Sequence, residues 1–242
     1  MAKKGGSRHL KRYAASRALK LPRKSFTWTT KAASGPHPSK GAIPLRLLLR
    51  DYLSVGHKGR VIDNILSKGN VLVDGKVRRE PKFPVGIMDV VQLPALGRSY
   101  RVLLDHRKRL IASEINQSEA SVKLCEVARK QIVRGGKVQL TFHDGKTLVG
   151  DLNEFKPRDV AKLALPDLKV LERFPFEVGA MALITGGTNV GKIGRISEIK
   201  RITSAQPNIV ILKTDGEELQ APEDYVFVVG KKKPSITLPG VR

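Results

Sequence analysis

The pattern of apolar and polar positions changes several times along the chain, and the first change is at residue 43. Residues 1–42 have little apolar periodicity and consist largely of Lys, Arg, Ala, Ser, Gly and Pro. A free segment of this composition is disordered, but it can follow an extended path along a phosphate backbone. Its isolated Phe26 and Trp28 suit either stacking on bases or filling a protein pocket. We predict a basic N-terminal arm.

The next stretch, residues 43–97, has a clear helical pattern. Apolar residues at 45, 48, 49, 52 and 53 form one stripe of a helix that begins after Pro44. Val61, Ile62, Ile65 and Leu66 predict the inward face of a second helix, which Gly69 terminates. Short strands follow around the turn Asp74-Gly75 and between residues 85 and 93. We predict two short helices against a small sheet.

Strand patterns dominate the rest of the chain. Residues 98–175 predict a central β domain, in which Val138, Leu140 and Phe142 alternate with polar residues. Residues 118–133 fit a helix or a strand equally well. Residues 176–230 alternate short strands with Gly-rich turns, which is typical of a small β-barrel. Residues 231–242 form a basic tail.

Charge narrows the class of partner. The 242 residues include 45 Lys and Arg but 22 Asp and Glu, a formal net charge of +23. Residues 1–40 hold 11 of these cations and no acid. A chain this basic repels itself unless it lies against a polyanion, most commonly nucleic acid. The rival, an anionic membrane, needs an amphipathic helix, which Pro22, Gly35, Pro36 and Pro38 exclude from the arm. No apolar run approaches 18 residues, and no secretory signal is expected.

Catalytic and metal-binding patterns are not found in the sequence. Gly186–Ile193 has the form G-x-x-x-x-G-K, but Ile193 replaces the Ser or Thr that a phosphate-binding P-loop needs, and a strand is predicted after it. The five His residues, at 9, 37, 57, 106 and 143, are scattered. The single Cys125 lies in an apolar stretch and is expected to be buried. We predict no enzyme activity, metal, cofactor or small-molecule substrate.

Two stretches resemble known RNA-binding modules. The strand, glycines and strand around Gly186-Gly187-Thr188-Asn189-Val190-Gly191-Lys192 resemble the KOW motif of ribosomal proteins and elongation factors. The order helix, helix, strand in 43–93, with Ile65–Lys76 and Asp89-Val90-Val91, resembles the alpha-L module of S-four type. The first resemblance implies backbone N–H groups facing RNA phosphates, with a purely structural turn as the alternative. The second implies a groove for structured RNA.

The order of all segments resembles the S-four-e family of small-subunit ribosomal proteins from archaea and eukaryotes. His9–Arg12, Gly35-Pro36-His37, Leu124–Val127, Gly136–Leu140 and Leu238-Pro239-Gly240 carry the likeness. It implies a multidomain α+β fold, mostly β, which ends in an SH3-like (KOW) β-barrel, with a strand over most of residues 122–133. The length, without eukaryotic extensions, is closer to that of the archaeal members.

The resemblance implies a structural constituent of the small ribosomal subunit in the cytoplasm, with ribosomal RNA and neighbouring ribosomal proteins as partners. The alternatives are a ribosome-associated assembly factor and an RNA-modifying enzyme anchored by the alpha-L module. The predicted rRNA-binding residues are the cations of these segments and one amide. They are Lys11, Arg12, Arg46, Arg50, Lys58, Arg60, Lys68, Arg78, Arg79, Lys82, Arg107, Lys108, Arg109, Asn189, Lys192, Arg195, Lys231, Lys232 and Lys233.

Overall fold

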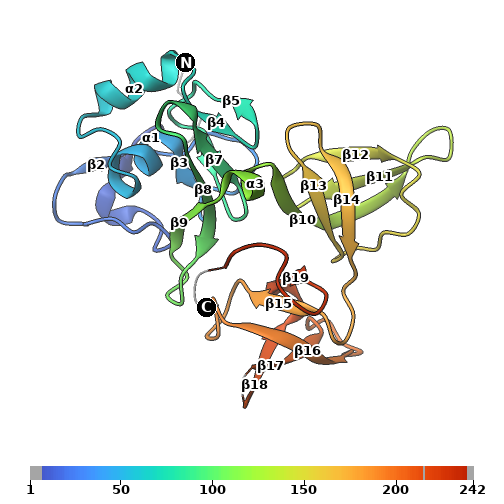
Figure 1. The fold of residues 1–242 in the computed structure, drawn as a ribbon. Helices are drawn as coiled ribbons and strands as arrows, with labels where there is room; N and C mark the ends of the chain where they lie inside the picture. The colour runs from blue at the N-terminus through green and yellow to red at the C-terminus, as the bar shows by residue number, and fades with distance from the viewer. Residues whose placement is uncertain (1–6, 215, 239–242) are drawn as a thin grey trace, which may run out of the picture.

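Three antiparallel sheets form most of the molecule (Figure 1). The computed structural model describes residues 7–214 and 216–238, so parts of the predicted arm and tail lie outside the described residues. Each sheet has five strands, and two smaller sheets of two strands accompany them in the described part of the chain. Helices are few and short, so the prediction of a mostly β protein with some α structure is confirmed.

The first sheet packs against the helices of the N-terminal half. The first helix is α1 (Leu45–Leu47), which continues as a wider π-helical turn, η2 (Leu48–Tyr52). Its predicted stripe is confirmed, since Leu45, Leu48 and Leu49 are fully buried. Burying such a side chain stabilises the fold by about 1.5–3 kcal/mol. The strands, in spatial order, are β5 (Lys76–Val77), β4 (Leu72–Val73), β7 (Val90–Leu93), β8 (Arg98–Leu104) and β9 (Leu110–Ile115).

The second helix, α2 (Gly59–Ser67), differs from the prediction at one position. Ile62 and Leu66 are buried as expected, but Val61 is 46% exposed, so its predicted inward position is wrong. Each residue advances about 100° around a helix, and Val61 therefore lies beside the buried stripe rather than in it. Gly69 follows the helix with φ +78°, as its role in helix termination requires.

The boundary predicted after residue 97 does not coincide with the end of the first sheet. β8 and β9 pair with each other, and β8 pairs with β7 in continuous antiparallel register. The first sheet therefore extends to Ile115, because the strands on both sides of residue 97 share one hydrogen-bonded ladder. Between them lies the short 3-10 helix η3 (Pro94–Leu96).

The second sheet is built around β10 (Val122–Ile132), which follows the short helix α3 (Gln117–Ala120). The first half of β10 pairs with β13 and the second half with β11, with a register shift at Val127. The strand implied for 122–133 is thus confirmed. Cys125 is fully buried, as predicted. The other strands are β11 (Val138–Phe142), β12 (Thr147–Gly150), β13 (Val160–Ala164) and β14 (Lys169–Phe174).

The third sheet contains one strand that the sequence pattern did not predict. β18 (Glu217–Pro222) lies at the edge of the sheet and buries only Leu219 and Ala221. Two apolar positions, one of them a small Ala, are too few to establish an alternating pattern. The remaining strands are β17 (Ile209–Thr214), β16 (Ile193–Lys200), β15 (Met181–Ile184) and β19 (Val226–Gly230), with the 3-10 helix η4 (Glu223–Tyr225) before β19.

Each five-stranded sheet, with the helices and loops around it, forms one lobe of the molecule. The three lobes, numbered as their sheets, share apolar contacts. The hydrophobic cluster of the third sheet includes Met88 and Leu103 from the first lobe and Leu124 and Val160 from the second. After β19, the tail returns to the same cluster through Ile236. Figure 1 shows the β8–β9 hairpin projecting toward the lobe that contains β15–β19.

The N-terminal arm is folded against the first lobe. It forms a short ribbon of β1 (Leu10–Lys11) and β2 (Trp28–Thr29), with the 3-10 helix η1 (Arg12–Ala14) between them. Ala15 and Leu19 belong to the hydrophobic cluster of the first lobe. A second ribbon joins β3 (Ile43–Pro44) to β6 (Pro84–Val85). These apolar contacts and the ribbon fix a segment that lacks helical or strand periodicity.

Candidate nucleic-acid interface

A basic groove lies between the N-terminal arm and the β8–β9 hairpin. Its volume is about 810 Å³. Five cations line it, and Asp51 is the one acid among the described residues of its wall. The cations are Arg17, Lys20 and Arg23 from the arm and Arg107 and Arg109 from the hairpin. The sequence prediction found the two hairpin residues but missed the three arm residues, since no motif singles them out from the other cations of the arm.

Hydrogen bonds from backbone N–H groups fix the arm against the rest of the groove. The N–H of Leu110 on β9 donates to the carbonyl oxygen of Ala18 in the arm (2.8 Å). The N–H of Lys20 donates to the phenolic oxygen of Tyr52 (2.7 Å). Burial raises the pKa of Tyr52 to about 12, which keeps that phenol neutral at physiological pH. The groove therefore has fixed walls, and its cationic side chains are mounted on them.

Arg12 organises the arm from inside, and its prediction as an RNA contact needs correction. Its side chain is 3% exposed, so it cannot reach a phosphate. One guanidinium nitrogen donates to the carbonyl of Pro22 (3.0 Å) and to the hydroxyl of Ser25 (2.9 Å), and another lies 3.7 Å from Asp51. The guanidinium also lies 5.4 Å from the centre of the Phe26 ring. We therefore remove Arg12 from the interface, whereas its neighbour Lys11 is exposed.

The tip of the β8–β9 hairpin meets the glycine loop between β15 and β16. Gly191 has φ +81°, and a Cβ there would lie 3.1 Å from the backbone nitrogen of His106. A Cβ on Gly186 would lie 2.7 Å from the ring of Tyr225. The ammonium of Lys108, at the tip of the hairpin, lies 5.6 Å from the centre of the same Tyr225 ring. In this structure the glycines permit close packing of the loop against the hairpin and Tyr225.

The cations predicted on the helix pair fall into two groups. Arg46 donates two hydrogen bonds to Asp63 (2.8 and 2.6 Å). Arg50 donates two to Asp51 (2.6 and 3.1 Å). Arg78 is half-buried, 4.5 Å from the ring centre of Phe83. The others are exposed and have no ion-pair partner within residues 7–214 and 216–238. They are Lys58, Arg60, Lys68, Arg79 and Lys82.

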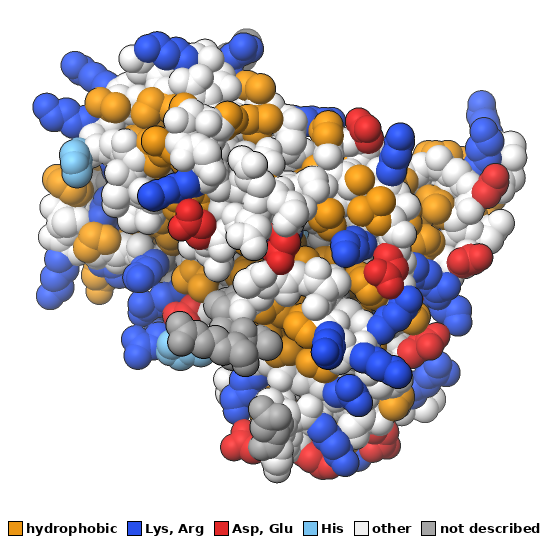
Figure 2. Space-filling model, viewed as in Figure 1, with side chains coloured by type: hydrophobic (Ala, Val, Ile, Leu, Met, Phe, Trp, Pro, Cys, Tyr) orange, Lys and Arg blue, Asp and Glu red, His pale blue; other side chains and the backbone are white. Residues whose placement is uncertain are grey.

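The remaining predicted residues lie around the third sheet. Lys192 pairs with Glu217 (3.2 Å), and Lys231 pairs with Glu172 (3.0 Å). Arg195, Lys232 and Lys233 are exposed, and Asn189 is half-buried. In Figure 2, Lys and Arg border the upper left of the molecule, where the helix pair lies, while most of the acids on this face lie to the right and below. Exposed cations therefore lie on the arm, the helix pair, the hairpin and the tail, and others, such as Arg195 and Lys200, lie on the third sheet.

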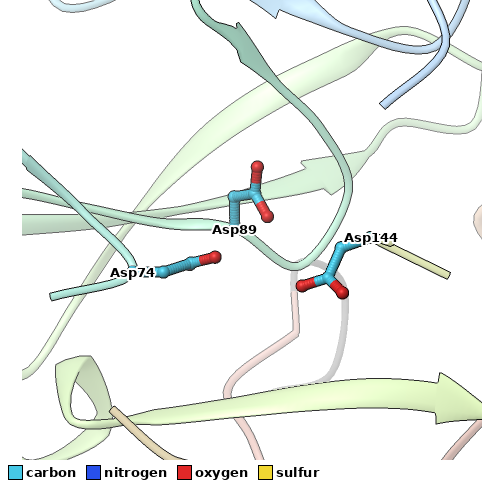
Figure 3. A group of neighbouring side chains, drawn as sticks. All are labelled: Asp74, Asp89 and Asp144. Atoms are coloured by element: carbon cyan, nitrogen blue, oxygen red, sulfur yellow. The ribbon is translucent and has the colours of Figure 1, made fainter. Parts of the chain in front are cut away.

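A buried ionic network joins the first and second lobes, and sequence analysis missed it. Lys123 of β10 is fully buried, and its ammonium donates to Asp74 (2.7 Å), Asp89 (2.5 Å) and Asp144 (2.8 Å). Figure 3 shows these carboxylates approaching one another from separate stretches of chain. His37 of the arm contacts Asp89 (2.9 Å). Residues this far apart in sequence give no motif; the only available signals were Asp-Gly turns at residues 74–75 and 144–145.

The network is charged in the folded state. Burial alone would raise the pKa of Asp89 and of Asp144, but the adjacent Lys123 outweighs it and lowers both pKa values. Burial lowers the pKa of Lys123, but the surrounding carboxylates raise it well above its ordinary value. Three carboxylates this close have the spacing of a metal site. Here the Lys123 ammonium lies among them and supplies the positive charge that such a group requires.

Basic grooves and exposed cations on a rigid, mostly β scaffold are typical of RNA-binding proteins. Comparison with known proteins gives the family. The model described as Ribosomal family S4e matches residues 96–170, and the RS4NT (NUC023) domain matches residues 4–40. Small ribosomal subunit protein eS4 of Archaeoglobus fulgidus is 45% identical over 233 residues, which cover 95% of this chain and 97% of that protein. The eS4 protein of Methanothermobacter thermautotrophicus is 41% identical, with 99% of both chains covered.

The fold agrees with this likeness. A crystal structure of the 30S ribosomal protein S4e from Thermoplasma acidophilum matches with a TM-score of 0.69 and 36% sequence identity, covering 79% of this chain and 96% of that one. The chain therefore belongs to ribosomal family S4e. This confirms the predicted family, and a family of ribosomal structural proteins agrees with the prediction that the chain is not an enzyme. Among the described residues, no helix has the length and apolar character to cross a membrane.

Proposed function

We propose that this protein is a structural constituent of the small ribosomal subunit, where it binds and orders ribosomal RNA and supports translation in the cytoplasm. The observation that carries the proposal is the groove between the arm and the β8–β9 hairpin, with five cations and one acid among its described lining residues. Family membership supplies the ribosome as the setting. Neighbouring ribosomal proteins are further expected partners.

The mechanism is electrostatic and geometric. The walls of the groove are tied by backbone hydrogen bonds, so its cations do not have to be gathered when RNA arrives. Each phosphate that they neutralise releases counterions, which favours binding at low salt. Proteins recognise structured RNA largely by shape and by phosphate and 2′-OH contacts. Free cations on the helix pair, including Lys58 and Arg60, extend this surface beyond the groove.

The finer division of the chain is part of the same proposal. Residues 43–97 act as the alpha-L-type module together with the strands that extend its sheet. Residues 176–230 form an SH3-like barrel of KOW type, whose loop is supported by Tyr225 and the hairpin. The tail from residue 231 contributes Lys232 and Lys233, which are exposed. In this arrangement three sheets form one scaffold, and the cations of its arm, hairpin and tail meet the RNA.

The test replaces three exposed groove cations, Arg17→Gln, Lys20→Gln and Arg107→Gln, in one variant. We expect affinity for a small-subunit rRNA fragment to fall, and the slope of log affinity against log salt to become shallower by about 2–3, because each lost phosphate contact removes about 0.7–0.9. Arg23 is left in place because its guanidinium donates to the carbonyl of Tyr13 (2.7 Å) and supports the arm.

A matched control removes the same charge elsewhere. Lys169, Lys200 and Arg201 are exposed, and they lie outside the groove and outside the predicted interface. Their replacement by Gln together should change the salt slope far less than the groove variant does. Equal slopes for the two variants would mean that the protein attracts RNA by net charge alone, and would contradict a binding role for the groove.

A further inference from the structure

The most exposed aromatic residues of the described chain lie in one segment of the protein. The chain has 7 Phe, 4 Tyr and 1 Trp, and those more than half exposed are Tyr13 (77%), Phe26 (71%) and Trp28 (55%). All three belong to the N-terminal arm. Large aromatic side chains are normally buried, because each removes about 150–250 Å² from water. Their concentration in one basic segment indicates a surface that is covered by a partner.

Two of these rings are held in place, with much of each ring left open to solvent. Phe26 lies over the guanidinium of the buried Arg12, which is itself tied to Pro22 and Ser25. Trp28 is in β2, opposite Lys11 of β1, and its ring meets that of His9 at 5.7 Å with the planes tilted by 57°. Each ring is therefore supported by a neighbour and does not have to be ordered when a partner binds.

Charge identifies the partner. Residues 1–40 contain no Asp or Glu. Lys11, opposite Trp28 in the ribbon, is exposed, and so are Arg8 and Lys24 of the same arm. A flat aromatic ring flanked by cations suits a nucleic-acid base, which stacks on the ring while its phosphates meet the cations. A duplex keeps its bases stacked on each other, so only an unpaired base can reach such a ring.

We propose that Trp28 and Phe26 form a stacking platform for unpaired bases of single-stranded RNA, and that the exposed Tyr13 of the same arm offers a further ring. This proposal rests on the proposed function, since it names the kind of RNA that the arm takes. The cations of the groove hold phosphates, and the platform adds a preference for single-stranded segments over duplex. Base stacking depends on the π-face and tolerates any base, so the platform selects unpaired structure rather than sequence.

Trp28 is the single tryptophan of the chain, which gives a direct readout in the full-length protein. Its emission is followed during titration with an eight-nucleotide oligoadenylate and, separately, with a blunt-ended RNA duplex at the same phosphate concentration and the same salt. Binding of each RNA is measured independently by anisotropy of a label on the RNA. We expect the single strand to quench the emission strongly at saturation, because stacking places a base against the indole ring, and the duplex to quench it far less.

Phe26→Leu tests the second ring, because Leu retains apolar bulk but lacks a π-face. The substitution should weaken oligoadenylate binding about tenfold, within the range measured for removing one stacking partner, and leave duplex binding unchanged. Ile132→Ala is the control, since Ile132 is an exposed apolar residue (76%) outside the arm. It should bind both RNAs as the unmodified protein does, and circular dichroism checks that both variants fold.

Three outcomes would overturn the proposal. The first is saturated binding of oligoadenylate with Trp28 emission unchanged, or with Phe26→Leu binding like the unmodified protein. The second is equal quenching by a polyglutamate peptide, which would assign the rings to an acidic protein surface. The third is binding of neither RNA, which would contradict the proposed function itself. The anisotropy measurement distinguishes this last case from failure of the platform alone.

Discussion

At the scale of single residues, Lys123 joins the parts of the molecule. It lies on β10 of the second sheet, yet two of its three carboxylate partners, Asp74 and Asp89, belong to the first lobe. The third, Asp144, lies in the β11–β12 turn and also contacts Lys146 (3.2 Å). Breaking a buried ion pair is costly, because it leaves charge in a medium that solvates it poorly.

Replacing Lys123 by Met should therefore destabilise the protein by about 3–5 kcal/mol, or prevent folding outright. Denaturant unfolding followed by circular dichroism measures the change. Lys146→Met is the comparison, because Lys146 is 22% exposed and its loss leaves the Lys123 ammonium among the carboxylates. Equal losses in the two variants would contradict the central position assigned to Lys123.

His143 gives the protein a dependence on pH. Its pKa is lowered to about 4, mainly because burial disfavours the imidazolium and also because Lys123 repels it. In the unfolded chain a histidine takes up a proton near pH 6.5. Between pH 6.5 and 4 the unfolded state therefore binds the proton more readily, and stability falls as pH falls, by up to about 3 kcal/mol.

The substitution His143→Gln removes this titration while it keeps an acceptor for the N–H of Glu126, which now donates to the imidazole (3.2 Å). Thermal unfolding midpoints between pH 7 and 4.5 should decline less steeply in this variant than in the unmodified protein. The depressed pKa values of Asp89 and Asp144 act in a lower window, because their contribution is lost only as pH falls below about 4. If the unfolding midpoints of His143→Gln and of the unmodified protein fall equally with pH, His143 is not the source of the pH dependence.

Individual residues were the hardest part of the site to predict from sequence. Arg12 and Lys11 are adjacent cations of the arm, but one is buried against Phe26 and the other is exposed. Nothing in their local sequence distinguishes them, because burial here depends on Asp51 and Pro22. Lys123 was overlooked for the same reason. The contacts that decide these roles connect residues from different elements.

At the scale of elements, sequence periodicity was a good guide where large apolar residues recur on the buried face. The stripe from Leu45 to Leu49 and the alternation from Val138 to Phe142 were both found where the chain forms a helix and a strand. Periodicity gave no decision for β10, which was assigned by resemblance, and it missed the edge strand β18. The sequence predicted only the hairpin cations of the groove. The other wall of the groove is the arm, whose folded path has no periodicity that would predict it.

The contact between the glycine loop and the β8–β9 hairpin yields a prediction at this scale. Gly191→Ala places a Cβ against the backbone of Asp105 and His106 at a residue with φ +81°. Gly136→Ala is the matched control, since its φ is +71° but nothing lies within 4 Å of a Cβ there. The control should cost about 1–2 kcal/mol for the left-handed backbone alone.

Gly191→Ala should cost more than this control, because the hairpin backbone has to move as well as the loop. Unfolding free energies of the two variants give the comparison. If Gly191→Ala is no more destabilising than Gly136→Ala, the loop and the hairpin are not packed closely enough for the hairpin to support the loop.

At the scale of the whole molecule, the parts that form the rigid scaffold differ from the parts that carry many of the exposed cations. The sheets and their shared apolar cluster supply a fixed scaffold. Many of the exposed cations lie on the arm, the helix pair, the hairpin and the tail. Composition alone predicted a polyanionic partner, because a net charge of +23 is otherwise self-repelling. The order of the segments then indicated the family, which neither charge nor periodicity can do.

Sedimentation tests whether the protein has a structural place in the small ribosomal subunit. The full-length protein is followed in a cell lysate through a gradient, before and after a high-salt wash. A structural constituent should stay with the small subunit at one copy per particle, because the packing of its folded modules against rRNA and neighbouring proteins remains when salt weakens the phosphate contacts. A protein that is substoichiometric, washes off or sediments as a free chain would contradict the account.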